Sequence, residues 1–190
     1  NIGSSDSYGV ALGDLDSDGD IDAFVANLIA PNKIWINDGS ASFTEAQSLT
    51  DASVSVALGD VDADGDLDAF VGNISNEAAI QGNRVWFNNG SGLFTTNNQL
   101  YALTDTYDLA LGDIDLDGDI DVFFANYSGL PDEVWLNDGS GTFSNSGQLL
   151  GQTSSQSVAL GDLDQDGDLD AFVANDGVTG ISSNKIWIRN

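Results

Sequence analysis

The stretch that decides the fold is ALGDLDSDGDIDAFVAN, which runs from Ala11 to Asn27. It recurs almost letter for letter three more times, with starts 46, 53 and 49 residues apart. The later copies are ALGDVDADGDLDAFVGN (Ala57 to Asn73), ALGDIDLDGDIDVFFAN (Ala110 to Asn126) and ALGDLDQDGDLDAFVAN (Ala159 to Asn175). A period of this length indicates a repeat architecture in which each copy forms one structural unit.

Each copy is followed by a segment that carries a tryptophan. These segments are NKIWIN (Asn32 to Asn37), NRVWFN (Asn83 to Asn88), DEVWLN (Asp132 to Asn137) and NKIWIRN (Asn184 to Asn190). The first three continue into an Asn-Asp-Gly or Asn-Asn-Gly turn, which suits a tight hairpin, and then a phenylalanine. In the first repeat, alternation and β-branched and aromatic content predict strands at 10–13, 21–26, 33–36 and 42–47.

Four short strands in about 50 residues are typical of a propeller blade. We therefore predict an all-β protein, a β-propeller built of four-stranded antiparallel blades. In this single repeat domain the blades are expected at about residues 7–51, 52–104, 105–153 and 154–190, and the last one lacks its outer strand. The repeat number leaves open whether four blades close alone, pair between chains or belong to a larger ring.

Large aromatic residues recur at equivalent positions in the four repeats. They are Phe24, Phe70, Phe123 and Phe172 in the second strands, and Trp35, Trp86, Trp135 and Trp187 in the third strands. Equivalence across repeats favours a place in the core between blades over a role in ligand binding.

Composition excludes several classes of function. The chain has 31 acidic and 4 basic residues, a formal charge of −27, which argues against nucleic acid and anionic lipid as partners. The lack of Cys and His excludes disulfides, zinc–thiolate sites and an imidazole base. No apolar run approaches the ~18 residues of a membrane span. The chain begins at Asn1 without a signal-like segment, as expected of a mature or excised piece.

Aspartates recur within each repeat with the spacing D-x-D-x-D-G-D-x-D, and these four nine-residue loops hold 20 of the 31 acidic residues. They are Asp14, Asp16, Asp18, Asp20 and Asp22; Asp60, Asp62, Asp64, Asp66 and Asp68; Asp113, Asp115, Asp117, Asp119 and Asp121; and Asp162, Asp164, Asp166, Asp168 and Asp170. Carboxylates this close repel one another and raise one another's pKa values. A solvated acidic face, kept for solubility, does not require such regular spacing.

A hard divalent cation explains the spacing. Calcium accepts six to eight oxygen ligands, and the glycine at loop position 6 permits the turn that wraps the ion. We predict side-chain ligands at positions 1, 3, 5 and 9 and a backbone carbonyl at position 7, with about four calcium ions per chain. An EF-hand is excluded because its position 12 needs a glutamate and its flanks should be helices. Position 12 holds Val25, Val71, Phe124 and Val173.

The aspartate loops, the F-V-A-N stretches that follow them and the N-D-G-S-G-T-F type turns resemble the FG-GAP/VCBS repeat family, the repeat of the integrin α-chain propeller and of many secreted bacterial proteins. The resemblance covers nearly the whole chain. It implies a β-propeller with calcium in the hairpin loops between the first and second strands, and a role in adhesion or recognition. Family propellers usually close with seven blades, whereas four repeats occur here.

A ligand is expected on the loop edge opposite the calcium loops, because the connections between second and third strands differ in length between repeats. Tyr8, Tyr101, Tyr107 and Tyr127 lie near these connections and are candidates for stacking on a sugar or peptide. Tolerated insertions would also produce variable loops.

We expect a calcium-binding, extracellular recognition or adhesion module, because millimolar calcium is found outside cells. Its partner would be a protein or carbohydrate at a cell surface or matrix. The alternative is a structural repeat of a surface fibre or larger assembly, which could self-associate through the open terminal blade. An enzyme is not expected, because the clustered carboxylates are committed to metal and no unpaired acid recurs elsewhere.

Overall fold

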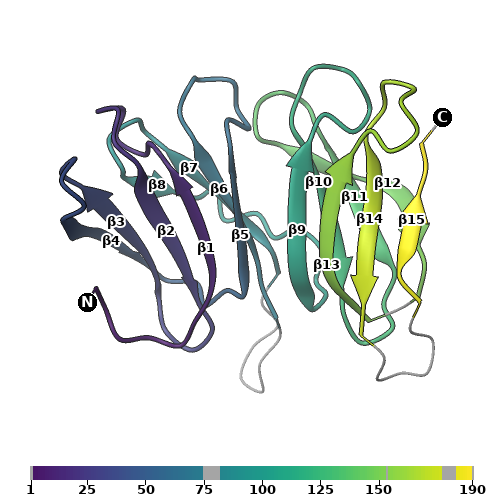
Figure 1. The fold of residues 1–190 in the computed structure, drawn as a ribbon, viewed down its shortest axis with the longest axis horizontal. Helices are drawn as coiled ribbons and strands as arrows, with labels where there is room; N and C mark the ends of the chain where they lie inside the picture. Colours follow the sequence, from purple (N-terminus) through teal and green to yellow (C-terminus); the bar gives the residue numbers. More distant parts are fainter. Residues whose placement is uncertain (1, 75–81, 153, 177–182, 190) are drawn as a thin grey trace.

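Each repeat folds into one antiparallel sheet, and the four sheets stand side by side (Figure 1). The computed structural model describes residues 2–74, 82–152, 154–176 and 183–189. The first sheet contains β1 (Ser7–Gly13), β2 (Asp22–Asn27), β3 (Asn32–Asn37) and β4 (Phe43–Leu49). The second contains β5 (Ser55–Gly59), β6 (Asp68–Gly72), β7 (Arg84–Asn88) and β8 (Phe94–Thr95). The third contains β9 (Thr106–Gly112), β10 (Asp121–Asn126), β11 (Asp132–Asn137) and β12 (Phe143–Leu150). The fourth contains β13 (Ser155–Gly161), β14 (Asp170–Asn175) and β15 (Lys185–Trp187).

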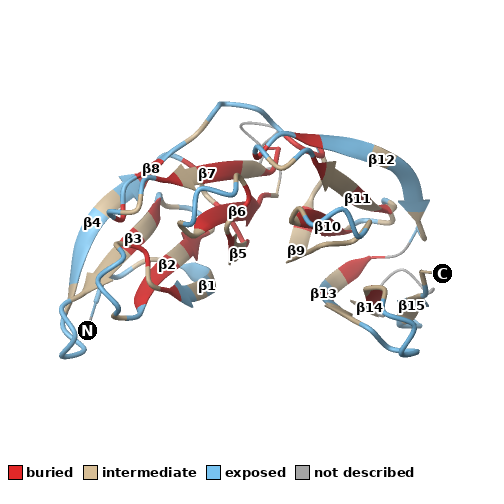
Figure 2. Ribbon diagram, turned by 90° about the horizontal axis from the view of Figure 1, so that it is seen from above, coloured by how far each residue is buried: buried red, intermediate tan, exposed pale blue. Residues whose placement is uncertain are grey.

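The sheets are the blades of a four-bladed β-propeller, and the described residues contain no helix. Neighbouring blades contact each other through their innermost strands, in the order β1, β5, β9 and β13. Figure 2 shows that the blades follow an arc, with the first and the fourth at its two ends. The predicted fold class is confirmed, including the three strands of the last blade.

The strand register explains why each blade has two different apolar faces. In the first blade, Phe24 lies opposite Ala11 and Ile34, whereas its neighbour Val25 lies opposite Val10 and Lys33. Successive side chains on a strand point to opposite faces of the sheet. One face of each blade therefore presents the phenylalanine equivalent to Phe24, and the other presents the tryptophan together with a valine or, in the third blade, Phe124.

The core lies between blades rather than inside any one of them. Phe24 and Ile34 of the first blade form one cluster with Val71 and Trp86 of the second. A second cluster joins the second and third blades, and a third joins the third and fourth. Each cluster thus packs the phenylalanine face of one blade onto the tryptophan face of the next, as the equivalent positions predicted.

The two ends of the arc expose the faces that inner blades bury. Phe24 and Phe70 are fully buried, but the equivalent Phe172 is 41% exposed, because within the described residues no further blade packs on this face of the fourth. The expectation of a core position between blades is wrong for this residue and for Trp35, which belongs to none of the three clusters. At the other end, Val10 and Leu12 of β1 are 63% and 64% exposed.

The second blade has an unusually short outer strand. β8 ends at Thr95, and pairing resumes only at the isolated bridge between Asn83 and Tyr101. Between them, Asn98 has a φ of 60° and its backbone N–H donates to the Thr96 hydroxyl at 3.1 Å. Consecutive asparagines tolerate this turn conformation, and the strand is interrupted there.

No helix in the described part of the chain has the length and apolar character that crossing a lipid bilayer requires.

Candidate metal centres

The aspartate loops join the first and second strands of every blade, and all four lie at the same end of the strands (Figure 1). In the first loop, the position-1 carboxylate of Asp14 accepts a hydrogen bond from the backbone N–H of Gly19 at 3.0 Å. The carboxylate of Asp18 accepts one from the N–H of Asp20 at 2.9 Å. Gly19 has a φ of 93°, a conformation that favours glycine. The bonds fold the loop back on itself, and the bond from glycine to position 1 recurs in the other three loops.

The position-9 aspartate anchors each loop to the rest of its blade. Asp22 is fully buried, and its carboxylate accepts hydrogen bonds from the N–H groups of Leu15 and Asn37, both at 2.8 Å. The equivalent aspartates of the other loops accept bonds from the same two positions. These carboxylates connect the beginning of the loop with the end of the third strand.

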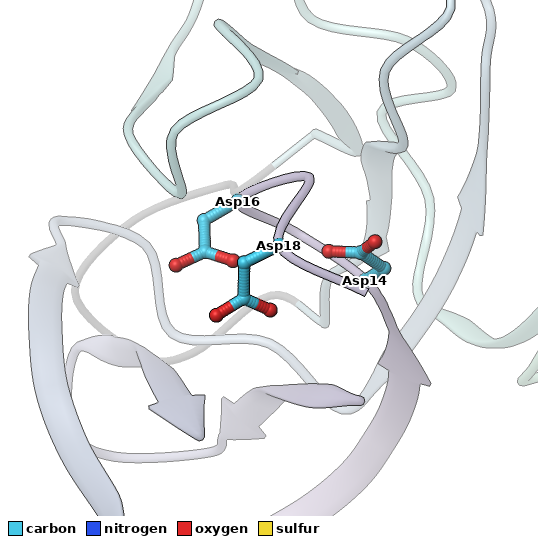
Figure 3. Close-up of side chains that lie close together, drawn as sticks. All are labelled: Asp14, Asp16 and Asp18. Atoms are coloured by element: carbon cyan, nitrogen blue, oxygen red, sulfur yellow. The ribbon is translucent and has the colours of Figure 1, made fainter. Parts of the chain in front are cut away.

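Three carboxylates meet in every loop. Figure 3 shows Asp14, Asp16 and Asp18 of the first loop, whose side chains lie close together. In the other loops the groups contain positions 1, 3 and 9: Asp60, Asp62 and Asp68; Asp113, Asp115 and Asp121; Asp162, Asp164 and Asp170. Within each group, one carboxylate oxygen per residue lies within 4.8 Å of the others. The loops therefore bring together the residues predicted at positions 1, 3 and either 5 or 9.

The electrostatics of these groups are unfavourable for carboxylates alone. Burial, followed by repulsion from Asp18 and Asp22, raises the pKa of Asp16. Burial and the neighbouring Asp64 raise the pKa of Asp62 in the second loop. Burial raises the pKa of Asp68 to about 7, against the opposing effect of its two backbone hydrogen bonds. Burial and mutual repulsion therefore disfavour the charged form of these carboxylates in the first two loops.

Several cluster oxygens are buried without a hydrogen-bond partner. They are the Oδ1 atoms of Asp14, Asp16, Asp62 and Asp113. The two ion pairs of the described residues, Lys33–Glu45 and Arg84–Asp51, involve no loop aspartate. Oxygen atoms of this kind are the ligands that calcium prefers, so the donor set fits a hard divalent cation.

The aspartate side chains at loop position 7 belong to none of the groups of three carboxylates. A Cβ atom on Gly90, in the turn between β7 and β8, would lie 2.5 Å from an oxygen of Asp66. Equivalent glycines in the first and third blades lie against Asp20 and Asp119 in the same way. These carboxylates therefore rest on the adjacent turn, outside the groups of three. A backbone carbonyl ligand at position 7 remains a prediction.

Three of the four candidate tyrosines, Tyr8, Tyr107 and Tyr127, lie near the strand ends opposite the aspartate loops. The rings of Tyr107 and Tyr127 contact each other with centroids 4.4 Å apart and their planes tilted by 34°. A hydrogen bond with Asp176 raises the pKa of Tyr127, and burial, Asp105 and Tyr8 raise that of Tyr107. Tyr8 is 63% exposed. Tyr8 lies in β1 and Tyr107 in β9, whereas Tyr127 and Asp176 directly follow β10 and β14, so these groups come from the first, third and fourth blades.

Tyr101 differs from the expectation. It is fully buried, and its ring contacts Phe70 and Phe143 with centroids 5.4 and 5.6 Å away. It fills the core between the second and third blades where the short β8 leaves space. An external ligand does not reach this ring, so Tyr101 is not a binding residue.

Sequence reasoning missed the asparagines that end the third strands. Asn88 donates its backbone N–H to Asp68 of its own loop at 2.8 Å and its side-chain amide to the Leu15 carbonyl of the preceding loop at 2.9 Å. Asn137 makes the same pair of contacts, to Asp121 and Val61. The recurrence of asparagine two residues after the tryptophan in the first three repeats was the available signal, but the contact between blades is not visible in the sequence.

The repeats of this chain match a known family of repeats. Residues 14–71, 60–124 and 113–173 match the model of the FG-GAP-like repeat family. No curated protein sequence matches the chain significantly.

Solved structures share the fold at low sequence identity. The crystal structure of the V. cholerae biofilm matrix protein Bap1 has 18% identity and a TM-score of 0.60, covering 94% of this chain and 26% of that one. BBS1N in complex with ARL6DN, soaked with lead, has 17% identity and a TM-score of 0.58, covering 97% of this chain and 57% of that one. The mercury-soaked form of that complex has 17% identity and a TM-score of 0.58, covering 98% of this chain and 55% of that one. The chain thus spans about half, or less, of the structures it matches.

Proposed function

The chain belongs to the FG-GAP-like repeat family, and from this premise we propose that it is a calcium-stabilised extracellular recognition module. The observation that carries the proposal is the four groups of three carboxylates, of which those in the first three loops contain buried oxygens that lack hydrogen-bond partners. Positions 1, 3, 5 and 9 of each loop would supply carboxylate ligands, and position 7 its backbone carbonyl.

The bound ion would be part of the folded structure. A cation between the three carboxylates relieves their repulsion, so ion binding and folding are coupled. With free calcium about a hundredfold above the dissociation constant, each site would stabilise the folded state by about 2.7 kcal/mol. Four sites would then contribute as much as the whole stability of a small domain, roughly 5–15 kcal/mol.

Chelation tests this proposal. We expect the melting temperature to fall after exhaustive dialysis against EGTA and to recover when calcium, but not magnesium, is added. Isothermal titration of the chelated protein should give about four ions. Asp62→Asn in the second loop should remove about one ion, because Asp62 carries one of the unpartnered oxygens. Asp6→Asn, an exposed acid outside the loops, is the matched control. An unchanged melting temperature in EGTA would refute a role for the ion in folding.

A recognition role is supported by the tyrosines at the strand ends opposite the aspartate loops. Tyr107, Tyr127 and Tyr8 combine aromatic surface with the carboxylates of Asp105 and Asp176, a combination that suits a sugar or peptide. Screening a glycan array with the protein and its Tyr127→Ala variant tests this site. Ligand binding that the substitution leaves unchanged would place the site elsewhere.

Extracellular placement would follow from a calcium requirement, because millimolar calcium is found outside cells, and the likeness to a biofilm matrix protein is compatible with it. The second candidate is a structural repeat within a larger assembly, and the apolar surface at both ends of the arc favours it. Light scattering separates the two, because a structural repeat should self-associate in calcium without any added ligand.

A further inference from the structure

One asparagine side chain contacts two of the aspartate loops. Asn88 is the last residue of β7, and its Nδ2 donates to the Leu15 carbonyl of the first loop at 2.9 Å and to the Leu67 carbonyl of the second loop at 3.2 Å. A side-chain amide carries two N–H donors, which allows one bond to each loop. Asn88 is buried, so water competes little for these bonds. The amide therefore bridges the two loops.

The same bridge recurs at the next pair of blades. Asn137 is the last residue of β11, and its Nδ2 donates to the Val61 carbonyl of the second loop at 2.7 Å and to the Ile120 carbonyl of the third loop at 3.1 Å. In both bridges the acceptors are position 2 of the earlier loop and position 8 of the later one. The bridge is thus a property of the repeat and not of one blade.

The bridged carbonyl groups lie directly beside the clustered carboxylates. Leu15 lies between the position-1 and position-3 aspartates of the first loop, and its N–H donates to Asp22 at 2.8 Å. Its carbonyl also accepts a bond from the Gly92 N–H at 2.8 Å, in the turn between β7 and β8. In the second loop, Leu67 directly precedes Asp68. A change in the shape of either loop therefore moves an acceptor of the bridging amide.

This arrangement links the state of one loop to that of the next. Without a cation, the carboxylates of a loop repel one another, which favours looser loop shapes. A bound cation would hold the loop and its carbonyl groups in one position, because metal binding and local folding are coupled. Since one amide binds both loops, fixing either loop favours the fixed form of the other, and such coupling between two sites is reciprocal.

We propose that Asn88 and Asn137 are positioning residues that couple calcium binding in successive loops, so that occupation of one loop raises the affinity of its neighbour. This inference rests on the calcium binding proposed above. Asn37 of the first blade provides the contrast. Within the described residues its amide donates to the Ile21 carbonyl of its own loop, at 3.2 Å, and to no second loop.

A site-resolved calcium titration tests the coupling. The backbone amides of Gly19, Gly65 and Gly118, at position 6 of the first three loops, report the sites separately by ¹⁵N NMR. Asp62→Asn impairs the second loop, and we expect it to weaken calcium binding at Gly19 in the first loop by about fivefold or more. In an Asn88→Ala background, Asp62→Asn should have no further effect at Gly19. This cycle separates the coupling from the direct effect of each substitution.

Asn37→Ala is the matched control, because it removes an amide that is bonded to one loop only. In this background, Asp62→Asn should still weaken calcium binding at Gly19 as it does in the wild type. The mirror cycle uses Asn137→Ala and is read at Gly118, and it replaces the first cycle if Asn88→Ala does not fold.

Two results would overturn the coupling. One is an Asp62→Asn substitution that leaves the calcium affinities of the first and third loops unchanged in the wild type. The other is a loss of affinity that is equally large with and without the bridging asparagine. If calcium moves none of the three glycine amides in the wild type, the calcium sites proposed above fail, and the coupling fails with them.

Discussion

Asp132 is a buried acid at a position where the other three repeats have asparagine. It is 1% exposed, and its carboxylate accepts hydrogen bonds from the Asn126 N–H at 2.8 Å and the Ser155 hydroxyl at 3.0 Å. No cation neutralises it, so burial raises its pKa to about 6. In the first blade, Asn32 makes the equivalent contacts: its Oδ1 accepts from the Asn27 N–H and its Nδ2 donates to the Ser53 hydroxyl.

Asp132→Asn should therefore stabilise the protein at neutral pH. The folded pKa of about 6 lies above the unfolded value of about 4, so the folded state binds more protons between these values and stability falls as pH rises through this window. A difference of about two units between the folded and unfolded pKa corresponds to roughly 3 kcal/mol in the free energy of unfolding. The wild type loses this stability fully above the folded pKa and regains it below about pH 4. For a chain of this size that is about 5–10 °C in melting temperature.

The assay is thermal unfolding of the wild type and variant in calcium at several pH values. The melting temperature of Asp132→Asn should exceed that of the wild type by several degrees at about pH 7.5, and the gap should narrow toward about pH 4. Asn83→Asp places the same acid at the equivalent, fully buried position of the second blade and should have the opposite effect. A gap that is independent of pH would refute the reasoning, because the charge would then not be the cause.

Two further predictions concern packing and ion pairing. Gly90→Ala should destabilise the protein by about 1–3 kcal/mol, because its φ is +71° and the new Cβ would meet the Asp66 carboxylate. Gly147→Ala is the control: its φ is +79°, but its Cβ would lie in open space. It should therefore cost only the ~1 kcal/mol of the left-handed backbone conformation. Equal losses in chemical denaturation would show that the carboxylate contact is unimportant. Arg84→Met leaves Asp51, which is 8% exposed and 3.2 Å from the guanidinium, as an unpaired buried charge, and should cost about 3 kcal/mol at neutral pH. A loss below about 0.5 kcal/mol would mean that Asp51 is solvated.

The sequence was sufficient for what depends on local chemistry. Alternation places Phe24 and Val25 on opposite faces of a strand, and the Asp–Gly spacing folds each loop through contacts within nine residues. Both features repeat with each copy, so the blades, their strand order and the meeting of Asp14 with Asp16 and Asp18 could be predicted from the pattern.

What depends on neighbouring blades could not be predicted. Phe172 has the same local sequence as Phe24, yet it is exposed because no described residues of another blade pack on it. The sequence places Tyr101 near a variable loop, but the interruption of β8 brings it into the core. The amide of Asn88 bonds to a loop 73 positions earlier. In each case the decisive partner lies in another repeat.

The location of the core between blades has a consequence for unfolding. Since every cluster straddles two sheets, each blade is stabilised only through its immediate neighbours, as in a one-dimensional chain of coupled units. The two inner blades are supported on both sides and the outer ones on one, and the fourth also has fewer strands. Native-state hydrogen exchange should therefore be slowest in β6 and β10 and fastest in β14, so that opening begins at the carboxyl end of the arc and propagates inward.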